Sequence, residues 1–151
     1  MNDVTCPLCT TTDDVLVFQD LQYRVIRAQE TGFPAFYRVI WTAHIAEFSD
    51  LSMVDQQTCM AAVAVVERVM RTLLKPTKIN LAALGNMVPH LHWHVIARFA
   101  WDSHYPAPVW ALAQRAVDSA ALAELASQLT AVDLAIQRQL AQGAAMGDTS
   151  N

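Results

Sequence analysis

The stretch GNMVPHLHWHVIAR, residues 85–98, carries three of the five histidines of the chain at alternating positions. Residues two apart on a β-strand share a face, so we expect His90, His92 and His94 to line one face of a strand. The residues between them are apolar and are expected to point into the core. The sequence therefore predicts a stripe of three imidazoles backed by hydrophobic packing.

This stripe points to function because imidazoles fill a protein core poorly. A lone histidine on a strand is typically a hydrogen-bonded structural residue, whereas three in register are a costly way to build a core. Two chemistries remain open from the residues alone: a metal site, or a nucleophilic imidazole flanked by helpers. Convergence of all three on one ion is disfavoured, because alternate residues on a straight strand span about 13 Å from first to last.

Outward from this stretch, the hydrophobic pattern predicts an α+β fold with an antiparallel sheet. A long helix is expected between the third and fourth strands, from Ser52, which resembles the start of a capping box, to Lys75, which precedes a proline. A second, alanine-rich helix is expected from Pro108 to Gln142. Strands are expected over residues 15–18, 23–28, 35–41, 79–84 and 90–99.

The 151 residues are enough for one domain with a hydrophobic core and too few for two of ordinary size. We expect residues 1–142 to form this domain and residues 143–151 to form a flexible C-terminal tail.

Composition narrows the classes of function. Apolar residues make up 54% of the chain and charged residues 16%, which is typical of a packed globular protein. A net charge of −4 disfavours binding to long nucleic acid but leaves room for a small anionic ligand. The acidic start does not look like a signal peptide, and the apolar run from Met60 to Val66 is far shorter than the ~20 residues of a membrane span. We expect a soluble, cytoplasmic protein without a membrane partner.

The three cysteines argue against a disulfide framework, because their number is odd and the expected compartment is reducing. Cys6 and Cys9 form a Cys-x-x-Cys pair, whose two thiolates can bind one tetrahedral zinc ion. Cys59 lies on the apolar stripe of the long helix and is expected to be an inert core residue.

The sequence resembles the histidine triad (HIT) family. Its signature, His-x-His-x-His followed by two apolar residues, matches the segment from His90 to Ile96 position for position. The segments IWTAHI at residues 40–45 and DLS at residues 50–52 resemble the family's strand ending in a histidine and its helix entry. The resemblance extends from about Cys6 to Arg98 and implies the HIT-like form of the α+β fold.

The resemblance implies a nucleotidyl hydrolase or transferase. Carried over, His92 attacks the α-phosphorus of a nucleotide and forms a nucleotidyl-histidine, which water then hydrolyses. His94 donates to the phosphate or the leaving group, and His90 completes the catalytic triad. Dinucleoside polyphosphates and nucleoside phosphoramidates are the implied substrates. No catalytic metal is expected, because imidazoles and amides supply the electrostatics.

The same resemblance indicates substrate-binding residues. Asn80 and Asn86 stand near positions where the family has amide side chains that face the phosphate, and Arg98 is a candidate cation beside it. Asn86 also follows Gly85, so it is equally interpreted as a turn residue. Met87 occupies a position where many members have a hydroxyl aimed at the leaving group. For the acidic residue that holds the ribose, Glu30 is the nearest candidate.

The resemblance also implies a metal site and a partner. Some family members, and the related galactose-1-phosphate uridylyltransferases, complete a cysteine pair with two histidines. Here that set is Cys6, Cys9, His44 and His90, a possible structural zinc site joining the N-terminus to the catalytic strand. The family usually forms homodimers, and we expect one here.

Two other functions stay open. One is a metallohydrolase with His90, His92 and His94 on a catalytic metal. The other is a nucleotide-binding, zinc-stabilised interaction module with little turnover, which Met87 favours. The isolated His104 is interpreted as a surface-loop residue.

Overall fold

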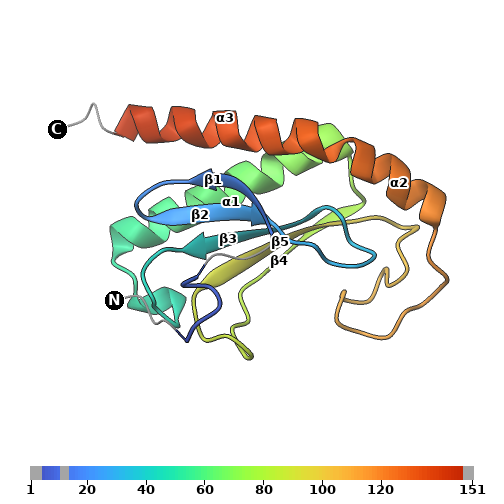
Figure 1. The fold of residues 1–151 in the computed structure, drawn as a ribbon, viewed down its shortest axis with the longest axis horizontal. Coiled ribbons are helices and arrows are strands. Elements are labelled where there is room, and N and C mark those ends of the chain that lie inside the picture. The colour runs from blue at the N-terminus through green and yellow to red at the C-terminus, as the bar shows by residue number, and fades with distance from the viewer. Residues whose placement is uncertain (1–4, 11–13, 148–151) are drawn as a thin grey trace.

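The computed structural model describes residues 5–10 and 14–147. Its centre is one five-stranded antiparallel sheet with the strand order β1-β2-β3-β5-β4 (Figure 1). The predicted α+β class with an antiparallel sheet is therefore confirmed. The strands are β1 (Val15–Gln19), β2 (Tyr23–Arg27), β3 (Phe36–Trp41), β4 (Lys78–Ala82) and β5 (His92–Arg98).

Alternation along β3 separates the two faces of the sheet. Tyr37, Val39 and Trp41 belong to the main core on one face. Phe36, Arg38 and Ile40 occupy the alternate positions, and they pair across the sheet with Ile96, His94 and His92 of β5. Partners in an antiparallel pair point to the same side. The face of the sheet away from the main core is therefore the one that carries His92 and His94, and we call it the histidine face.

The long helix α1 (Met53–Leu74) covers the core face of the sheet. Ser52 caps it by accepting a hydrogen bond from the backbone N–H of Asp55, as the capping pattern predicted. Lys75 ends the helix in the left-handed conformation, with a φ of 48°, directly before Pro76. One side of the helix is buried, including Cys59, Val63, Val66 and Met70.

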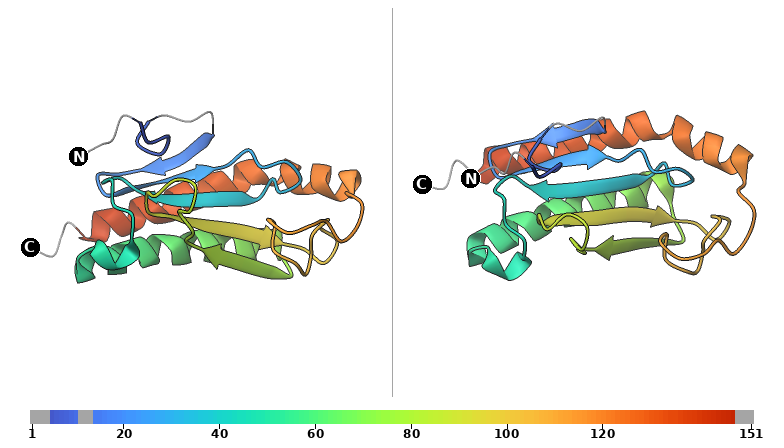
Figure 2. Two further views of the ribbon diagram at one scale, coloured as in Figure 1. Left: turned by 90° about the horizontal axis from the view of Figure 1, so that it is seen from below. Right: turned by 60° about the horizontal axis from the view of Figure 1, so that its bottom comes forward.

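A second helix, α3 (Leu129–Gly147), lies beside α1 on the same face of the sheet (Figures 1 and 2). Asp133 of α3 accepts hydrogen bonds from Nε and Nη2 of Arg27 and from the hydroxyl of Tyr37, which joins this helix to β2 and β3. The apolar stripe of α3 is buried and consists of Leu129, Val132, Ile136 and Leu140.

The C-terminal third differs from the sequence prediction at both ends. The short helix α2 (Ser119–Ser127) starts only after Asp118, which caps it, so residues 108–118 are not helical. The backbone N–H groups of Gln114 and Arg115 bond instead to the carbonyl of Ser103. At the other end, α3 passes through Gly143 and continues to Gly147, because one glycine costs a helix only about 1 kcal/mol. Residues 148–151 of the expected tail lie outside the described residues.

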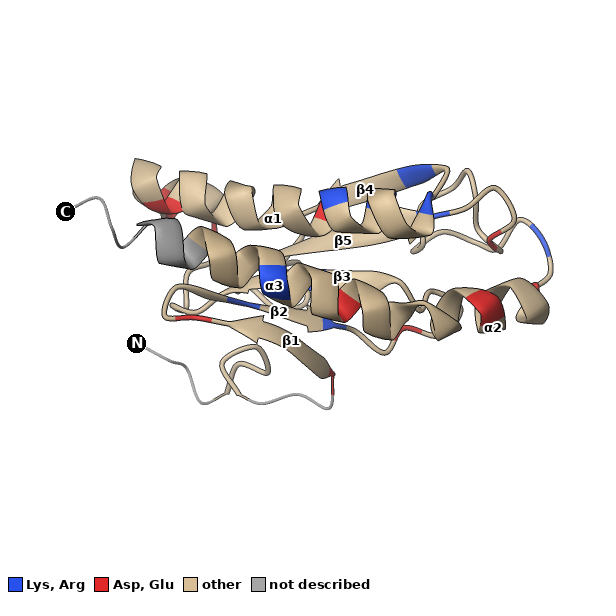
Figure 3. Cartoon of the chain, turned by 90° about the horizontal axis from the view of Figure 1, so that it is seen from above, with Lys and Arg blue, Asp and Glu red and all other residues tan. Residues whose placement is uncertain are grey.

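Residues Ser119–Gly143 are long and apolar enough to pass as a membrane span by length and composition. In the fold its second half packs one apolar stripe of α3 into the core, while the rest of that helix is largely exposed, and Asp133 is ion-paired with Arg27. Figure 3 shows only scattered charged residues on the helices of this layer.

Candidate active site and metal centre

His92 and His94 lie side by side on the histidine face of β5, with ring centroids 4.8 Å apart. Both side chains are buried, although neither belongs to the main core. Their positions follow from the strand alternation, which sends Val95 and Ala97 into the core and the two imidazoles to the other side. This part of the predicted stripe is present in the structure.

His92 is held in one tautomer. Its Nδ1 lies 2.6 Å from the backbone carbonyl oxygen of His90. A carbonyl oxygen only accepts hydrogen bonds, so Nδ1 carries the proton and Nε2 keeps its lone pair. Burial, with a smaller contribution from the charge of Arg38, lowers the pKa of His92 below its usual value. The ring is therefore a neutral imidazole with a nucleophilic Nε2 at physiological pH.

His94 lies in an aromatic enclosure. Phe36 and Trp110 meet its ring edge-on at centroid distances of 5.4 and 5.3 Å, and His92 closes a third side. Burial lowers the pKa of His94 to about 4, helped by its neighbours His92 and Arg38. Among the described residues, Nδ1 of His94 is buried without a hydrogen-bond partner. This atom is a candidate for contact with a substrate group.

His90 lies just before β5, so the prediction that this strand begins at residue 90 is wrong by two residues. The backbone N–H of His90 donates to Val88 in a tight turn, and that of Leu91 donates to Ile45, so β5 begins only at His92. The His90 ring is fully buried and lies against the sulfur atoms of Cys6 and Cys9. Beside the candidate nucleophile, His90 contributes its backbone carbonyl, which accepts the hydrogen bond from His92.

The ring of His90 belongs to a cluster with Cys6, Cys9 and His44, whose candidate ligand atoms all lie within 4.8 Å of one another. Nε2 of His90 is 2.6 Å from the carbonyl oxygen of Trp41, so it carries the proton and leaves Nδ1 free. That Nδ1 lies 3.6 and 3.5 Å from the sulfur atoms of Cys6 and Cys9. Nδ1 of His44 lies 3.3 Å from the sulfur of Cys9.

These separations fit a metal centre. Two thiolates and two imidazoles are a standard donor set for structural zinc, and ligand atoms on one tetrahedral zinc lie about 3.3–3.8 Å apart. The expected four residues are thus brought together, in a site that can hold a metal ion. This group of described residues contains neither His92 nor His94, which argues against a single ion shared by the three histidines.

Three loops build the cluster at one end of the sheet. The cysteine loop is held by Arg24, whose guanidinium donates to the carbonyl of Leu8. The loop after β3 carries His44, and the loop before β5 carries His90. These last two loops are tied together by the bond from Leu91 to Ile45. A bound ion would therefore join segments that are more than 80 residues apart in sequence.

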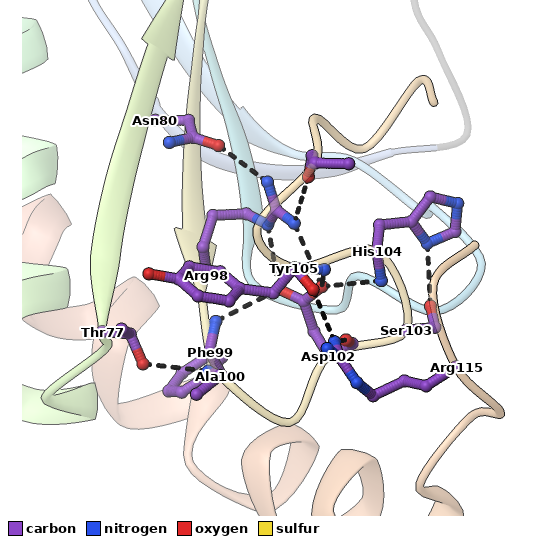
Figure 4. A network of polar contacts seen from close by, with 11 residues as sticks. Thr77, Asn80, Arg98, Phe99, Ala100, Asp102, Ser103, His104, Tyr105 and Arg115 are labelled. Atoms are coloured by element: carbon purple, nitrogen blue, oxygen red, sulfur yellow. Dashed lines mark hydrogen bonds and ion pairs between the residues drawn. The ribbon is translucent and has the colours of Figure 1, made fainter. Parts of the chain in front are cut away.

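Arg98 is buried at the other end of β5, with only 1% of its surface exposed. Nε and Nη2 bond to the carboxylate of Asp102, and Nη2 also donates to the carbonyl of Ala107 (Figure 4). Nη1 donates to the side-chain oxygen of Asn80. Every nitrogen of this guanidinium thus has an acceptor within the protein. The expectation of a cation facing a phosphate does not fit this placement.

Arg98 instead anchors the loop after β5. Burial raises the pKa of Asp102, but hydrogen bonds from Arg98 and from the backbone of Phe99 and His104 outweigh it and hold that pKa below its ordinary value. Arg115 donates to the carbonyls of Asp102 and Tyr105 (Figure 4). This network fixes the segment that carries Trp110 to His94.

The other sequence candidates lie at different places. Asn80 is on β4 opposite Ile96, on the histidine face, with its oxygen engaged by Arg98 and its amide nitrogen available. Asn86 is exposed in the loop before β5, and Met87 beside it is 93% exposed. Glu30 forms an ion pair with Arg38. His104 is partly buried against the ring of Phe33 rather than free on the surface.

Sequence reasoning missed two residues of the site, Arg38 and Trp110. Arg38 is the only charged residue on β3, so its position on the face opposite Tyr37 and Val39 was available as a signal. Trp110 had no local signal, because it reaches His94 only through the folding of a loop of a dozen residues.

Comparison with known proteins agrees with this geometry. The chain matches the model of the HIT domain over residues 10–101. It is similar to the crystal structure of a histidine triad protein from Bradyrhizobium japonicum, with 28% identity and a TM-score of 0.67 over 85% of this chain and 91% of that one. A histidine triad protein from Marinobacter aquaeolei VT8 gives 27% identity and a TM-score of 0.66 over 86% and 90%. A search of curated proteins found no significant match.

The enclosure of His94 generates a pH prediction. NMR titration should show this imidazole still neutral at pH 6 and protonating near pH 4, against an ordinary value of 6.5. As pH falls, the unfolded chain takes up this proton near pH 6.5 and the folded chain only near pH 4. The free energy of unfolding should therefore fall progressively between these two pH values. Trp110→Ala should raise the pKa of His94 by opening one wall. Trp101→Ala should leave the pKa of His94 unchanged, because the ring of Trp101 stacks on Phe99 instead. An ordinary pKa in the wild type would contradict the enclosure.

Proposed function

The chain belongs to the histidine triad family, and on this premise we propose that it cleaves nucleoside phosphate derivatives at the α-phosphate through a covalent nucleotidyl-histidine on His92. The observation that carries the proposal is the hydrogen bond from Nδ1 of His92 to the His90 carbonyl. This bond leaves Nε2 as the free nitrogen, on a ring that burial keeps neutral. A neutral imidazole is both a nucleophile and a leaving group for phosphorus.

The proposed reaction has two steps. First, the Nε2 lone pair attacks the α-phosphorus, so a P–N bond forms while the bond to the leaving group breaks. The leaving group departs with that electron pair, and an amine also takes up a proton from water. Second, a water oxygen attacks the same phosphorus, the P–N bond breaks, and its electron pair returns to Nε2. The water proton passes to solvent, and a nucleoside monophosphate is released. In a transfer reaction another acceptor replaces this water.

Neighbouring groups assist without a catalytic metal in this proposal. His94, adjacent to His92 and neutral, donates a hydrogen bond to the phosphate or the leaving group as negative charge develops there. Asn80 offers its amide N–H groups from β4, and Asn86 offers an amide from the exposed loop. A catalytic role for the His90 ring receives no support from its geometry, because that ring faces the cysteines.

We also propose that Cys6, Cys9, His44 and His90 hold a structural zinc ion. A zinc ion held by these four residues would crosslink the loops that carry them and would take part in no chemical step. Because His90 is both a ligand and the acceptor for His92, the ion would fix the backbone that orients the nucleophile. The expected partners remain a small nucleotide and a second copy of the chain, in the cytoplasm.

A second candidate function is a nucleotide-binding, zinc-stabilised module with little turnover. The observation that favours it is Met87, whose side chain is exposed where family members place a hydroxyl beside the leaving group. In that case nucleotides bind without being cleaved. The experiment below separates the two functions.

The test of the leading proposal is intact-mass spectrometry of protein quenched after mixing with diadenosine tetraphosphate or with an adenosine phosphoramidate. We expect an adduct of one adenylate on the wild type, together with release of adenosine monophosphate. His92→Ala should give neither the adduct nor the product. His104→Ala serves as the matched control, because it leaves His92 and its hydrogen bond to the His90 carbonyl in place. Turnover by His92→Ala at the wild-type rate would refute the covalent role. Nucleotide binding by the wild type with neither adduct nor product would favour the binding module.

The zinc proposal is tested by elemental analysis of protein purified without chelators. We expect one zinc per chain in the wild type and in Cys59→Ala, since Cys59 is buried in α1 away from the cluster. Cys9→Ser should lose the metal and unfold at a lower temperature, because the three loops lose their crosslink. Wild-type protein that contains no zinc after growth in zinc-supplemented medium would rule out the proposal.

A further inference from the structure

Arg38 places a positive charge beside the two catalytic histidines. It lies on β3 directly opposite His94 in the antiparallel register, so the two side chains project from the same face. Cβ atoms of such partners lie about 5 Å apart. The guanidinium lies over the ring of Phe36 at 5.4 Å, and that ring in turn meets the ring of His94. Arg38 is therefore part of the wall around His94.

The hydrogen bonding of Arg38 is incomplete. Nη2 bonds to Glu30 at 2.6 Å, while Nη1 lies 3.9 Å from Asp14, at the outer limit of an ion pair. Nε is buried and has no partner among the described residues. Arg98, in contrast, has an acceptor for every nitrogen. A guanidinium that served only to hold the fold would be expected to have its donors satisfied as Arg98 does.

Glu30 is a weak anchor for this charge. Its side chain is 43% exposed, whereas that of Arg38 is 21% exposed. An exposed carboxylate returns to water at little cost, so an incoming anion can replace it. The guanidinium suits such an anion, because its planar fork binds phosphate oxygens through two hydrogen bonds.

The register indicates which part of a substrate Arg38 meets. The residue opposite His92 is the apolar Ile40, and Arg38 is diagonal to His92, about 7–8 Å away between Cβ atoms. The charge is thus displaced from the nucleophile toward His94, the residue assigned above to the phosphate or the leaving group. Its field still reaches both rings, since it contributes to the lowered pKa of each.

We propose that Arg38 is a specificity-determining residue that binds an anionic leaving group, so that the site prefers substrates from which a polyphosphate departs. This inference rests on the function proposed above and deepens it. In the free protein Arg38 is held by Glu30, and in the complex its terminal nitrogens bind phosphate oxygens beyond the α-phosphate. Substrates with a neutral amine as the leaving group gain nothing from this contact.

The test compares two substrates in the Arg38→Met variant, which keeps an unbranched stem over Phe36 but removes the charge. A hydrogen bond to a charged group contributes about 1.5–3 kcal/mol, which corresponds to a loss of roughly 10- to 150-fold. We expect kcat/KM for diadenosine tetraphosphate to fall by this factor and kcat/KM for the adenosine phosphoramidate to change less than about threefold. Arg38→Lys should restore part of the preference.

Arg27→Met is the matched control. Arg27 lies on the neighbouring strand β2, but it is bound to Asp133 of α3 on the opposite face of the sheet. This variant should lose stability and keep the wild-type ratio between the two substrates. An equal loss for both substrates in Arg38→Met, or an unchanged ratio, would overturn the proposal.

A binding measurement separates this inference from the proposed function. Titration of His92→Ala with ATP, which is the polyphosphate that leaves diadenosine tetraphosphate, does not depend on turnover. The affinity for ATP should be at least tenfold lower in the double variant His92→Ala/Arg38→Met than in His92→Ala. If the wild type turns over neither substrate, the proposed function fails, while this fall in affinity still supports an anion site at Arg38. Equal affinity in both variants would refute that site.

Discussion

The hydrogen bond between the His90 carbonyl and Nδ1 of His92, at 2.6 Å, joins the candidate metal centre to the candidate nucleophile. On one side of this bond the His90 ring is fixed by the Trp41 carbonyl and faces the two cysteines. On the other side the His92 ring is fixed in the tautomer that exposes Nε2. His90 therefore contributes in two ways: its side chain belongs to the candidate metal cluster, and its backbone carbonyl accepts the hydrogen bond that orients the His92 ring. A zinc ion at this position would act on the chemistry only through the position of that carbonyl.

Burial sets the protonation state of the two histidines on β5. Both imidazoles are buried, and burial disfavours their charged forms, which leaves a nitrogen lone pair free for the proposed attack on phosphorus. His94 is the more enclosed of the two, between Phe36, Trp110 and His92. Trp110 reaches that position because the buried Arg98–Asp102 pair ties down the loop after β5. A charged network at one end of the strand thus sets the surroundings of a neutral histidine in its middle.

Much of the fold could be predicted from the sequence, because its signals are local. The alternation on β3 and the cap at Ser52 are patterns within a few residues, and the strands and long helix follow from them. The start of α2 could not be predicted, since residues 108–118 look apolar and alanine-rich but give their backbone hydrogen bonds to Ser103. That partner is distant enough in sequence that no local pattern indicates it.

The candidate site was predictable in its membership and less so in its geometry. The motif identified the histidines and the cysteine pair, but it could not reveal that a turn at Val88 removes His90 from the strand. Arg98 was expected near a phosphate, yet its acceptors Asp102 and Ala107 come from a loop that only the folded chain places over it. Arg38 was overlooked because a single arginine on an apolar strand gains meaning only once the register sets it opposite His94.

The most direct test of this account is the tautomer of His92, read from nitrogen-15 NMR of the imidazole in the metal-loaded protein at neutral pH. We expect Nδ1 to carry the proton and Nε2 to be unprotonated, and we expect this preference to weaken in Cys9→Ser, where the loop before β5 is no longer held by the cluster. A proton on Nε2 in the wild-type protein would contradict the account, because the nitrogen that must attack phosphorus would then have no free lone pair.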